Sequence, residues 1–435
     1  MNVRLQNMKI AFYTLGCKVN QYETEVLREK FNELGYTVVS DREDFDIIVI
    51  NSCTVTAESD RKTRQTVRHF RKNHPNAVIL LTGCMAQAFP EDASKLCEAD
   101  IVVGNTDISK IPSLVSSFLE SKKRIIDVCP HERNEVFNTP LISSFAERTR
   151  AYVKIEDGCE RYCTYCIIPK ARGAVRSKSL EEIRKEAENL AKNGYSEIVL
   201  VGINLSAYGK DEDFDLGDVV KTVCGVDGIK RVRLGSLEPD HISDKMLTDF
   251  KSSDKFCPQF HLSLQSGCDE TLKRMNRHYD SAFYMELITR IRSIFPDAAI
   301  TTDIMVGFPG ETEEEFEKSV EFLKKVGFAK SHVFAYSRRE GTIAYGLPDQ
   351  VSRTEKSRRS SIMINAASEC EKAFLHTLVG KIHPVLFETA DDGFAVGYTP
   401  NYSKILVSSP LSFTGEIHNV KITEAYDDYC IGEIV

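Results

Sequence analysis

Short apolar runs alternate with helix-length polar stretches through residues 8–120 of the chain. The apolar runs KIAFYTLG, FDIIVINS and NAVILLTG are separated by segments such as NQYETEVLREKFNELG, whose apolar residues recur at helical spacing. Strands separated by helix-length segments are typical of βαβ units, and right-handed crossovers then give a doubly wound layer. The pattern therefore predicts an N-terminal α/β domain built on a parallel sheet.

A second alternation begins near Tyr152. YVKIEDG, EIVLVGIN, RVRLGSLEP, QFHLSLQSG, AAITTDIMVGF and AKSHVFAYS have the character of strands, and helical segments separate them. About six or seven such βα repeats predict a complete or partial TIM-type barrel, in which the chemistry lies at the C-terminal ends of the strands.

The end of the chain has a third pattern, in which short strands such as KIHPVLFETA and GFAVGYTP are separated by turn residues. This pattern predicts a small five-stranded barrel of the OB type. The predicted fold class is α/β, with a parallel-sheet α/β domain at 1–120, a linker at 121–148, a partial TIM-type (βα) barrel at 149–371 and an OB-like β-barrel at 372–435.

Composition narrows the class of protein. The chain has 435 residues, of which 42% are hydrophobic and 28% charged, as in ordinary globular proteins. No apolar run approaches the ~18 residues of a membrane helix, and the first residues lack the apolar stretch of a signal peptide, so we expect a cytoplasmic protein with no membrane partner. There, 13 cysteines indicate metal ligation, redox chemistry or buried packing rather than disulfides.

Three cysteines lie close together in the segment EDGCERYCTYCIIPKARG, directly after the first strand of the central domain. Cys159, Cys163 and Cys166 have the spacing C-x3-C-x2-C. Closely spaced thiolates in a loop bind iron–sulfur clusters, and three of them leave one iron of a cubane cluster with an open position. The alternatives are a chance grouping or a structural zinc site, but zinc usually takes four ligands and no fourth cysteine or histidine lies nearby.

A second cysteine set is dispersed along the N-terminal domain. Cys17, Cys53 and Cys84 each follow an apolar strand directly, in FYTLGC, VINSC and LLTGC. Parallel strands end on one edge of a sheet, so we expect the three thiols to converge there and to hold a second cluster with an open iron. The alternative is three buried, inert cysteines. The other cysteines have no such context and are interpreted as bystanders: Cys97, Cys129, Cys224, Cys257, Cys268, Cys370 and Cys430.

The three-cysteine loop resembles the radical S-adenosylmethionine (SAM) superfamily, in which the open iron chelates SAM and one electron yields a 5′-deoxyadenosyl radical. The resemblance implies a catalytic role for Cys159, Cys163 and Cys166. It also places Tyr165 near the adenine of SAM, with packing of the cluster loop as the alternative.

Later strand ends resemble the regions that cradle SAM in this superfamily. Where many members have Gly-Gly-Glu after the second strand, this chain has Gly-Ile-Asn. Helix capping is the alternative for Ser236, Ser266 and Asp303. The cofactor contacts that the resemblance implies are Gly202, Asn204, Ser236, Glu238, Gln265 and Asp303.

Two open-site clusters in one chain are similar to the methylthiotransferase family, whose members combine a cluster domain, a radical SAM barrel and a TRAM domain. The resemblance implies two [4Fe–4S] clusters, one SAM as methyl donor and one as radical source, an electron donor and a sulfur source.

Within this family, TLGCKVNQYETE resembles the branch that inserts a methylthio group at C2 of N6-threonylcarbamoyladenosine, at position 37 in the tRNA anticodon loop. The alternatives are isopentenyladenosine in tRNA, for which Gln-Met-Asn tends to follow this cysteine, and a ribosomal-protein aspartate, for which Pro-Lys-Asn does.

The net charge of −8 argues mildly against a nucleic-acid partner, but its distribution reverses that expectation. Two basic runs without acids, RKTRQTVRHFRKNH and PKARGAVRSK, flank the cysteine sets, although a solvated helix face is the alternative for either. Residues 371–435 carry four lysines against nine acids, so we expect this domain to add local contacts such as stacking by Tyr398 or Tyr402. The predicted RNA contacts are Arg61, Arg64, Lys170, Arg172 and Arg176.

A different class of function is a non-catalytic iron–sulfur protein that binds RNA or transfers electrons. It shares the cysteines with the enzyme but requires no SAM cleavage, so formation of 5′-deoxyadenosine from SAM separates the two.

Overall fold

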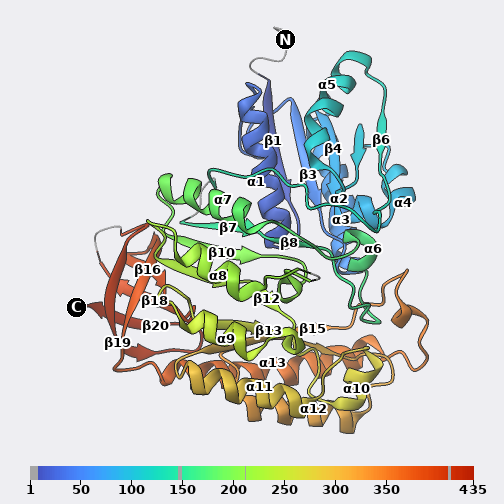
Figure 1. Ribbon diagram of the computed structural model, residues 1–435. Helices are drawn as coiled ribbons and strands as arrows, with labels where there is room; N and C mark the ends of the chain where they lie inside the picture. Colours follow the sequence, from blue (N-terminus) through green and yellow to red (C-terminus); the bar gives the residue numbers. More distant parts are fainter. Residues whose placement is uncertain (1–7, 146–148, 211, 410–412) are drawn as a thin grey trace.

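The computed structural model describes residues 8–145, 149–210, 212–409 and 413–435 and shows three regions in contact (Figure 1). The N-terminal region is a six-stranded sheet in which all neighbouring strands are parallel, as predicted. Its order is β2 (Thr37–Val38), β1 (Lys9–Thr14), β3 (Ile47–Ser52), β4 (Val78–Gly83), β5 (Ile101–Val103) and β6 (Ile125–Asp127).

Helices cover both faces of this sheet. Buried side chains of α1 (Lys18–Glu33) and α5 (Ile111–Ser121) pack on one face, and those of α2 (Ala57–Asn73), α3 (Cys84–Ala88) and α4 (Pro90–Ser94) on the other. Every residue of β3 and β4 is buried, as expected for central strands covered twice.

One part of the predicted linker belongs to the sheet. β6 lies within residues 121–148 and pairs with β5 over three residues. The short IID segment has little periodicity of its own, and its strand conformation comes from this edge pairing.

The central region is an open barrel of parallel strands. A strand running from Arg231 to Leu237 is interrupted at Gly235, so that its first half pairs with β10 and its second half with β13. Six strand positions result, at the lower end of the predicted range. They are β7 (Arg150–Lys154), β10 (Glu197–Val201), β11 (Arg231–Leu234) with β12 (Ser236–Leu237), β13 (Gln259–Leu262), β14 (Ala299–Val306) and β15 (Lys330–Ala335).

Helices line the outside of the barrel, and in Figure 1 α9, α11, α12 and α13 lie along its lower side. α13 is the longest and packs against β15. The helices are α7 (Leu180–Lys192), α8 (Leu216–Cys224), α9 (Asp244–Lys251), α10 (Asp269–Arg274), α11 (Ser281–Ile294), α12 (Glu313–Val326) and α13 (Arg353–His376). The short elements β8 (Glu156–Asp157), α6 (Ile168–Arg172) and β9 (Arg176–Ser177) surround the loop cysteines.

The C-terminal region is a closed five-stranded barrel, which confirms the OB-like prediction. The strands pair in the order β16-β17-β18-β20-β19, and β19 pairs with β16 to close the ring. They are β16 (Ile382–Asp391), β17 (Phe394–Tyr398), β18 (Lys404–Ser408), β19 (Ile417–Ala425) and β20 (Cys430–Ile434).

The N-terminal and central regions share one continuous hydrophobic core. A buried polar network reinforces this interface: the Tyr22 hydroxyl donates to Glu186 at 2.7 Å, and the Lys178 ammonium lies 2.5 Å from the same carboxylate. Removing one member of a buried network leaves the others unpaired, so the interface holds α1 in a defined position over the barrel.

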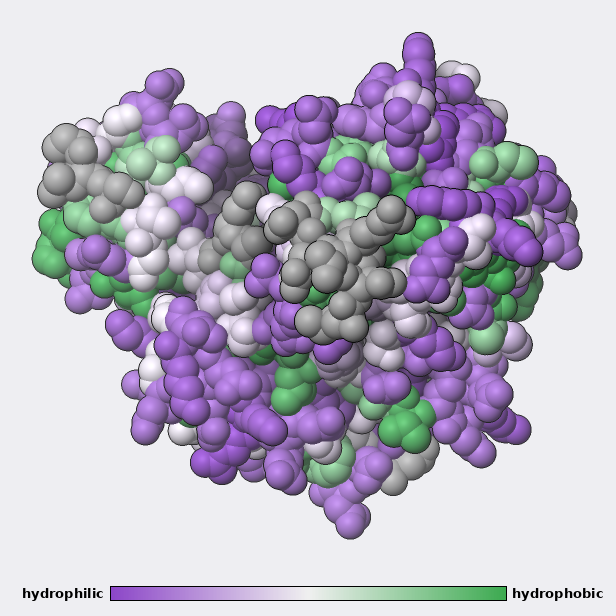
Figure 2. All heavy atoms as spheres, turned by 90° about the horizontal axis from the view of Figure 1, so that it is seen from above, coloured by the Kyte–Doolittle hydropathy of each residue, from purple (hydrophilic) through white to green (hydrophobic). Residues whose placement is uncertain are grey.

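No helix within the described ranges is long and apolar enough to span a bilayer. The face seen in Figure 2 is mostly hydrophilic, with hydrophobic side chains in small separate areas. Scattered apolar residues of this kind are normal on a folded protein.

Candidate functional site

The three dispersed cysteines lie at one edge of the N-terminal sheet. Cys17 precedes α1, Cys53 follows β3, and Cys84 is the first residue of α3, directly after β4. The turn at Gly16 has φ +116°, and a Cβ built there would lie 3.0 Å from the Cβ of Cys53. Glycine is therefore required for the close approach of these two segments.

The environment of this trio disfavours free thiolates. Burial raises the pKa of the Cys17, Cys53 and Cys84 thiols, and neighbouring thiols of the trio raise them further. Arg172 acts in the opposite direction on Cys17 and Cys84. Thiols in such a place ionise when a cation binds them, which is the behaviour of metal ligands.

Arg172 is fully buried and contacts this cysteine site. Its Nε donates to the Sγ of Cys84 at 3.2 Å, and its guanidinium is paired with Glu23 and lies 3.5 Å from Asp157. The prediction of Arg172 as an RNA contact is wrong, because the side chain has no exposed surface. Arg176 is also mostly enclosed, since its side chain is 10% exposed and its guanidinium lies 3.2 Å from Asp157.

The other basic residues remain on the surface. Lys170 is exposed, with its ammonium 4.6 Å from the centre of the Phe89 ring. Arg61 and Arg64 lie on α2, where Arg61 is exposed and pairs with Glu58 and Arg64 is half-buried. These three side chains keep the accessibility that an RNA contact requires.

The loop cysteines lie beyond the C-terminal end of β7. Burial raises the pKa of the Cys159 thiol to about 12 and raises that of Cys166 as well. The loop turns at Tyr162, which has φ 49°, and the Asn276 side chain donates to the Tyr162 carbonyl at 3.2 Å.

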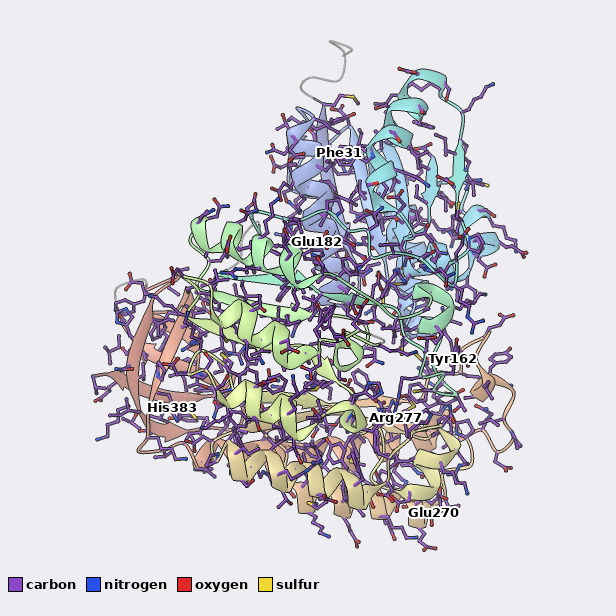
Figure 3. The ribbon with its side chains drawn as sticks, in the orientation of Figure 1. Phe31, Tyr162, Glu182, Glu270, Arg277 and His383 are labelled. Carbon is purple, nitrogen blue, oxygen red and sulfur yellow. The ribbon has the colours of Figure 1, made fainter. Side chains whose placement is uncertain are left out.

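Arg277 was not predicted from the sequence, yet it contacts this second site. Its Nη1 donates to the Sγ of Cys163 at 3.3 Å and to Glu238 at 3.1 Å. Figure 3 shows Arg277 on the same side of the barrel as Tyr162 of the cysteine loop. Arg277 lies in the segment between α10 and α11 rather than at a strand end, so the strand-end pattern could not indicate it.

Glu238, a predicted cofactor contact, is engaged with arginines in this structure. In addition to its pair with Arg277, the Glu238 carboxylate lies 3.9 Å from the guanidinium of Arg161. That guanidinium forms a bidentate pair with Asp240 at 2.8 and 2.9 Å. Glu238 therefore helps to balance the charge of Arg277 next to Cys163.

The cysteine arrangements suit clusters better than single ions. Among the described residues, the group whose ligand atoms all lie within 4.8 Å of one another is Asp215, Asp218 and Asp249; neither cysteine trio is so compact. A zinc ion with thiolates at about 2.3 Å would need the sulfurs closer together, whereas a cluster of several irons spreads its ligands. Thiol ligands with buried arginines beside them fit an anionic iron–sulfur cluster at either site.

The end of the second barrel strand, β10, lies in tight contact with β8, the short strand that follows β7. A Cβ at Gly202 would lie 2.6 Å from Oε2 of Glu156, and the backbone N–H of Asn204 donates to that oxygen at 2.7 Å. Burial, with Asp157 adjacent, raises the pKa of Glu156 well above its usual value. The chain thus has a buried carboxyl group beside the Gly-Ile-Asn segment, supplied by β8, which follows the first strand.

The remaining predicted cofactor residues surround the barrel mouth. Tyr165 packs edge-on against Phe308 with ring centres 6.4 Å apart. The backbone of Gln265 bonds to β14, and the Ser266 hydroxyl accepts from the backbone N–H of Cys268, the residue that precedes α10, so Ser266 does not cap the helix itself. Asp303 lies 3.3 Å from His261.

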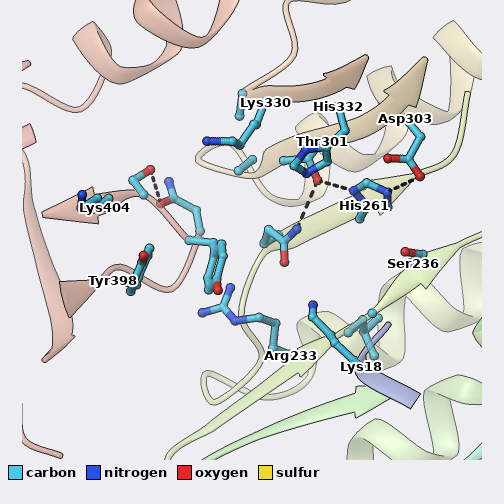
Figure 4. Close-up of a pocket in the computed structure, with 18 of the residues that line it drawn as sticks. Lys18, Arg233, Ser236, His261, Thr301, Asp303, Lys330, His332, Tyr398 and Lys404 are labelled. Carbon is cyan, nitrogen blue, oxygen red and sulfur yellow. Dashed lines mark hydrogen bonds and ion pairs between the residues drawn. The ribbon is translucent and has the colours of Figure 1, made fainter. Parts of the chain in front are cut away.

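A cavity of about 760 Å³ occupies the barrel interior and reaches from Cys17 to the C-terminal barrel (Figure 4). Of the predicted cofactor contacts, Gly202, Ser236 and Asp303 line it. Lys18 also lines it and keeps exposed surface there; desolvation by the cavity walls together with Arg233 and Arg150 lowers the pKa of Lys18. The cavity has the size of a small-molecule site and joins one cysteine set to the barrel interior.

Tyr398 and Tyr402 pack at the far end of this cavity. Their rings stack on one another with centres 4.7 Å apart, and Arg233 lies 4.6 Å from the centre of the Tyr402 ring. These contacts connect the C-terminal barrel to the central domain and use ring faces that would otherwise be open to a base.

A partial (βα) barrel with three cysteines in the loop after its first strand defines a radical SAM enzyme, a class that uses a [4Fe–4S] cluster and SAM. Three family descriptions match the chain in order: "Uncharacterized protein family UPF0004" at residues 9–104, "Radical SAM superfamily" at 153–323 and "TRAM domain" at 376–435.

Curated relatives match almost the whole chain. Threonylcarbamoyladenosine tRNA methylthiotransferase MtaB of Bacillus subtilis is 38% identical, covering 98% of this chain and 96% of the relative. The protein of the same name from Thermotoga maritima is 38% identical, with 94% and 93% covered. A tRNA-2-methylthio-N(6)-dimethylallyladenosine synthase of Thermoanaerobacter is 34% identical, with 99% and 93% covered. The chain belongs to the tRNA methylthiotransferase family.

Solved structures support the fold alone. The radical SAM methyltransferase TsrM of Kitasatospora setae has a TM-score of 0.56 at 12% identity, covering 76% of this chain and 75% of that one. The cobalamin-dependent SAM radical enzyme OxsB has a TM-score of 0.53 at 10% identity, covering 83% of this chain and 56% of that one.

Proposed function

We propose that the protein inserts a methylthio group at C2 of N6-threonylcarbamoyladenosine, at position 37 in the tRNA anticodon loop. One SAM serves as methyl donor and a second as source of the 5′-deoxyadenosyl radical. The observation that carries the proposal is the cavity that joins Cys17 to the barrel interior, because a sulfur held at the first site and a substrate base in the cavity would then be neighbours.

Two [4Fe–4S] clusters are part of this proposal. Cys159, Cys163 and Cys166 would hold the cluster that binds SAM, and Cys17, Cys53 and Cys84 the auxiliary cluster. When bound, these groups supply electron transfer to SAM and an exchangeable sulfur. The chain's contribution is to bury Cys53, Cys84 and Cys163, and to place Arg277 and Arg172 against Cys163 and Cys84.

The residues expected to contact the cofactor differ in their position relative to the cavity. Gly202, Ser236 and Asp303 face the cavity, which supports a direct contact with bound SAM or base. Glu238 would act through Arg277, whereas Tyr165, Asn204 and Gln265 would shape the surrounding loops.

The tRNA would approach over the surface that carries Lys170, with Arg61 and Arg64 on α2 as further contacts. An unpaired, splayed base can enter a cavity that a stacked base cannot reach, so an anticodon loop suits this site. An electron donor and a sulfur source complete the reaction, and a cytoplasmic location gives access to all three partners.

The test is mass spectrometry of tRNA nucleosides from a strain of the source organism without this gene. The proposal predicts loss of 2-methylthio-N6-threonylcarbamoyladenosine and accumulation of its precursor, with restoration by the wild-type gene. An unchanged level of this methylthio nucleoside would refute the proposal. Loss of 2-methylthio-isopentenyladenosine instead would show that the protein acts on isopentenyladenosine in tRNA.

A further inference from the structure

Charged side chains line the cavity beside Cys17, and only some of the cations among them form ion pairs with acidic residues. The lysines and arginine that line it are Lys18, Arg233, Lys330 and Lys404. Figure 4 shows Lys18 and Arg233 on the side of β11, and Lys330 and Lys404 on the opposite walls. Which of these cations already has a partner decides which is available to a ligand.

Arg233 and Lys330 are already engaged. The guanidinium of Arg233 donates to Glu197 at 3.1 Å and to the Pro400 carbonyl at 2.8 Å, and it stacks on Tyr402. The ammonium of Lys330 pairs with Glu371 at 3.0 Å. Both side chains therefore stabilise the walls of the cavity and the attachment of the C-terminal barrel.

Lys18 is different. It is the first residue of α1, its side chain borders the cavity, and none of the described residues forms a hydrogen bond or ion pair with its ammonium. The α1 N-terminus has no side-chain cap and no acidic residue in its first turn. The backbone N–H groups of Val19 and Asn20 in this first turn face the Cys17 thiol, so the helix N-terminus serves the cysteine site and the Lys18 side chain carries the positive charge that faces the cavity.

Buried arginines near Lys18 add to the positive field. Glu197 is shared by Arg150, Arg231 and Arg233 at 3.6, 3.5 and 3.1 Å, so one carboxylate faces three guanidinium groups. Glu388 pairs with Arg150, which still leaves positive charge in excess. The three acids that line the cavity lie elsewhere: Asp303 is next to His261, Glu371 is paired with Lys330, and Asp428 belongs to the C-terminal barrel.

We propose that Lys18 is the specificity-determining residue of this site and binds the carboxylate of the threonylcarbamoyl group on the substrate base. This inference rests on the proposed function. The threonylcarbamoyl group ends in a carboxylate, whereas an isopentenyl group is apolar and would cover the Lys18 ammonium, which is exposed in the empty cavity, without giving it a partner. Covering a charged group without pairing it costs free energy, so such a site disfavours the neutral ligand.

The position of Lys18 suits this role. It follows Cys17 directly, so an ammonium that holds the far end of the modified base would also fix the base relative to the sulfur-bearing site. The reacting carbon and the carboxylate belong to one molecule, and holding both ends restricts its orientation.

The test uses cluster-loaded enzyme and two synthetic anticodon stem-loops, one with threonylcarbamoyladenosine and one with its carboxamide, which lacks the negative charge. The quantity measured is kcat/KM for the methylthio product. We expect the wild-type enzyme to prefer the carboxylate substrate by roughly 10- to 100-fold. Lys18→Gln is expected to lose that preference through a lower rate on the carboxylate substrate, with the carboxamide rate within about twofold.

Two further variants separate charge recognition from a structural role. Lys18→Arg keeps the charge and is expected to retain the preference. Lys404→Gln removes a lysine from the opposite end of the cavity and is expected to affect both substrates equally. Iron content and 5′-deoxyadenosine formation are measured on every preparation, so loss of a cluster is recognised independently.

Each outcome decides one point. An equal loss on both substrates by Lys18→Gln with full iron would overturn the inference, as would a wild-type enzyme that modifies both substrates equally. If Lys18→Gln loses iron, Lys18→Arg decides: a loaded variant that discriminates supports the inference, and one that does not overturns it. A loaded wild-type enzyme that modifies neither substrate overturns the proposed function itself.

Discussion

Cys159, Cys163 and Cys166 lie within one loop, whereas Cys17, Cys53 and Cys84 come from three strand ends of a sheet. Despite this difference, a buried arginine from a separate segment donates to one sulfur at each site: Arg277 to Cys163 and Arg172 to Cys84. Each arginine is in turn balanced by a glutamate. The comparison shows that a cysteine pattern specifies the ligands, while the counter-charge that makes thiolate ligation favourable comes from the tertiary structure.

The two arginines differ in what they connect. Arg277 pairs with Glu238, whose side chain is 17% exposed, within the central barrel. Arg172 follows the loop cysteines in sequence but reaches Cys84 and Glu23 in the N-terminal domain, where Glu23 is 3% exposed. Arg172 thus links the two cysteine sites through a more deeply buried ion pair.

The largest expected effect separates the two cysteine sets. Replacing Cys159, Cys163 and Cys166 by Ala should abolish 5′-deoxyadenosine formation, whereas replacing Cys17, Cys53 and Cys84 should leave it intact and stop only methylthio transfer. Each triple variant should retain about half of the wild-type iron, because each trio holds one of two equal clusters. Full iron retention by the second variant would refute the auxiliary cluster.

Replacing the arginines tests the shared electrostatic arrangement. Arg172→Met should lower the free energy of unfolding by about 3–5 kcal/mol, since it leaves Glu23 and Asp157 with too few cations, and Arg277→Met should cost less because Glu238 is nearer to solvent. Denaturant unfolding of matched, equally loaded preparations measures both. Adding Glu23→Gln to Arg172→Met should recover part of the loss, and a strictly additive double variant would argue against the pair.

The neighbouring carboxyl groups of Glu156 and Asp157 have pKa values that are shifted in opposite directions. Burial acts to raise the pKa of Asp157, but Lys154, Arg172 and Arg176 outweigh it and hold that pKa well below its usual value, while burial raises the pKa of Glu156. Asp157→Asn should therefore lower the free energy of unfolding at pH 7 by about 3 kcal/mol, and Glu156→Gln should leave it unchanged or raise it by about 1 kcal/mol.

The pH dependence of this pair follows from the direction of each shift. The stabilisation by Asp157 is present above its unfolded-state pKa of about 3.9 and is lost as the pH falls through its lower folded-state pKa. The contribution of Glu156 is present below about pH 4.3 and is lost as the pH rises through its higher folded-state pKa. A destabilisation by Asp157→Asn that is the same at low pH and at pH 7 would contradict this assignment.

The smallest effect concerns the basic surface. Lys170→Ala should weaken tRNA binding modestly and reduce the slope of log affinity against log salt by roughly one unit if its ammonium contacts one phosphate. Arg61→Ala should act in the same way. Filter binding at several salt concentrations measures both slopes, and Lys185→Ala on the outer helix α7 is a matched control. Slopes identical to that of the wild type would show that Lys170 and Arg61 do not contact tRNA phosphates.

The sequence predicted the regular parts of the molecule because apolar runs and helical periods arise locally. The parallel sheet, the open barrel, the closed C-terminal barrel and the placement of Cys17, Cys53 and Cys84 at strand ends all follow from such patterns. β6 was missed because three residues at a sheet edge carry too little pattern, and its conformation depends on β5.

Contacts between distant segments could not be predicted in the same way. The basic run around Arg172 predicts an RNA contact, but the partners of this side chain, Glu23 and Cys84, lie far away in sequence. Arg277 lies between helices, and nothing local indicates that it reaches Cys163. Sequence spacing finds residues that act together in one loop or at successive strand ends, whereas charge balance in a buried site requires the packed structure.

The most direct test of the account is the reaction of the purified, cluster-loaded protein with SAM, a reductant and defined tRNA. The account predicts that tRNA carrying N6-threonylcarbamoyladenosine yields its 2-methylthio derivative together with 5′-deoxyadenosine, and that tRNA carrying isopentenyladenosine stays unmodified. Methylthiolation of the isopentenyl substrate alone, or SAM cleavage with neither tRNA modified, would contradict it.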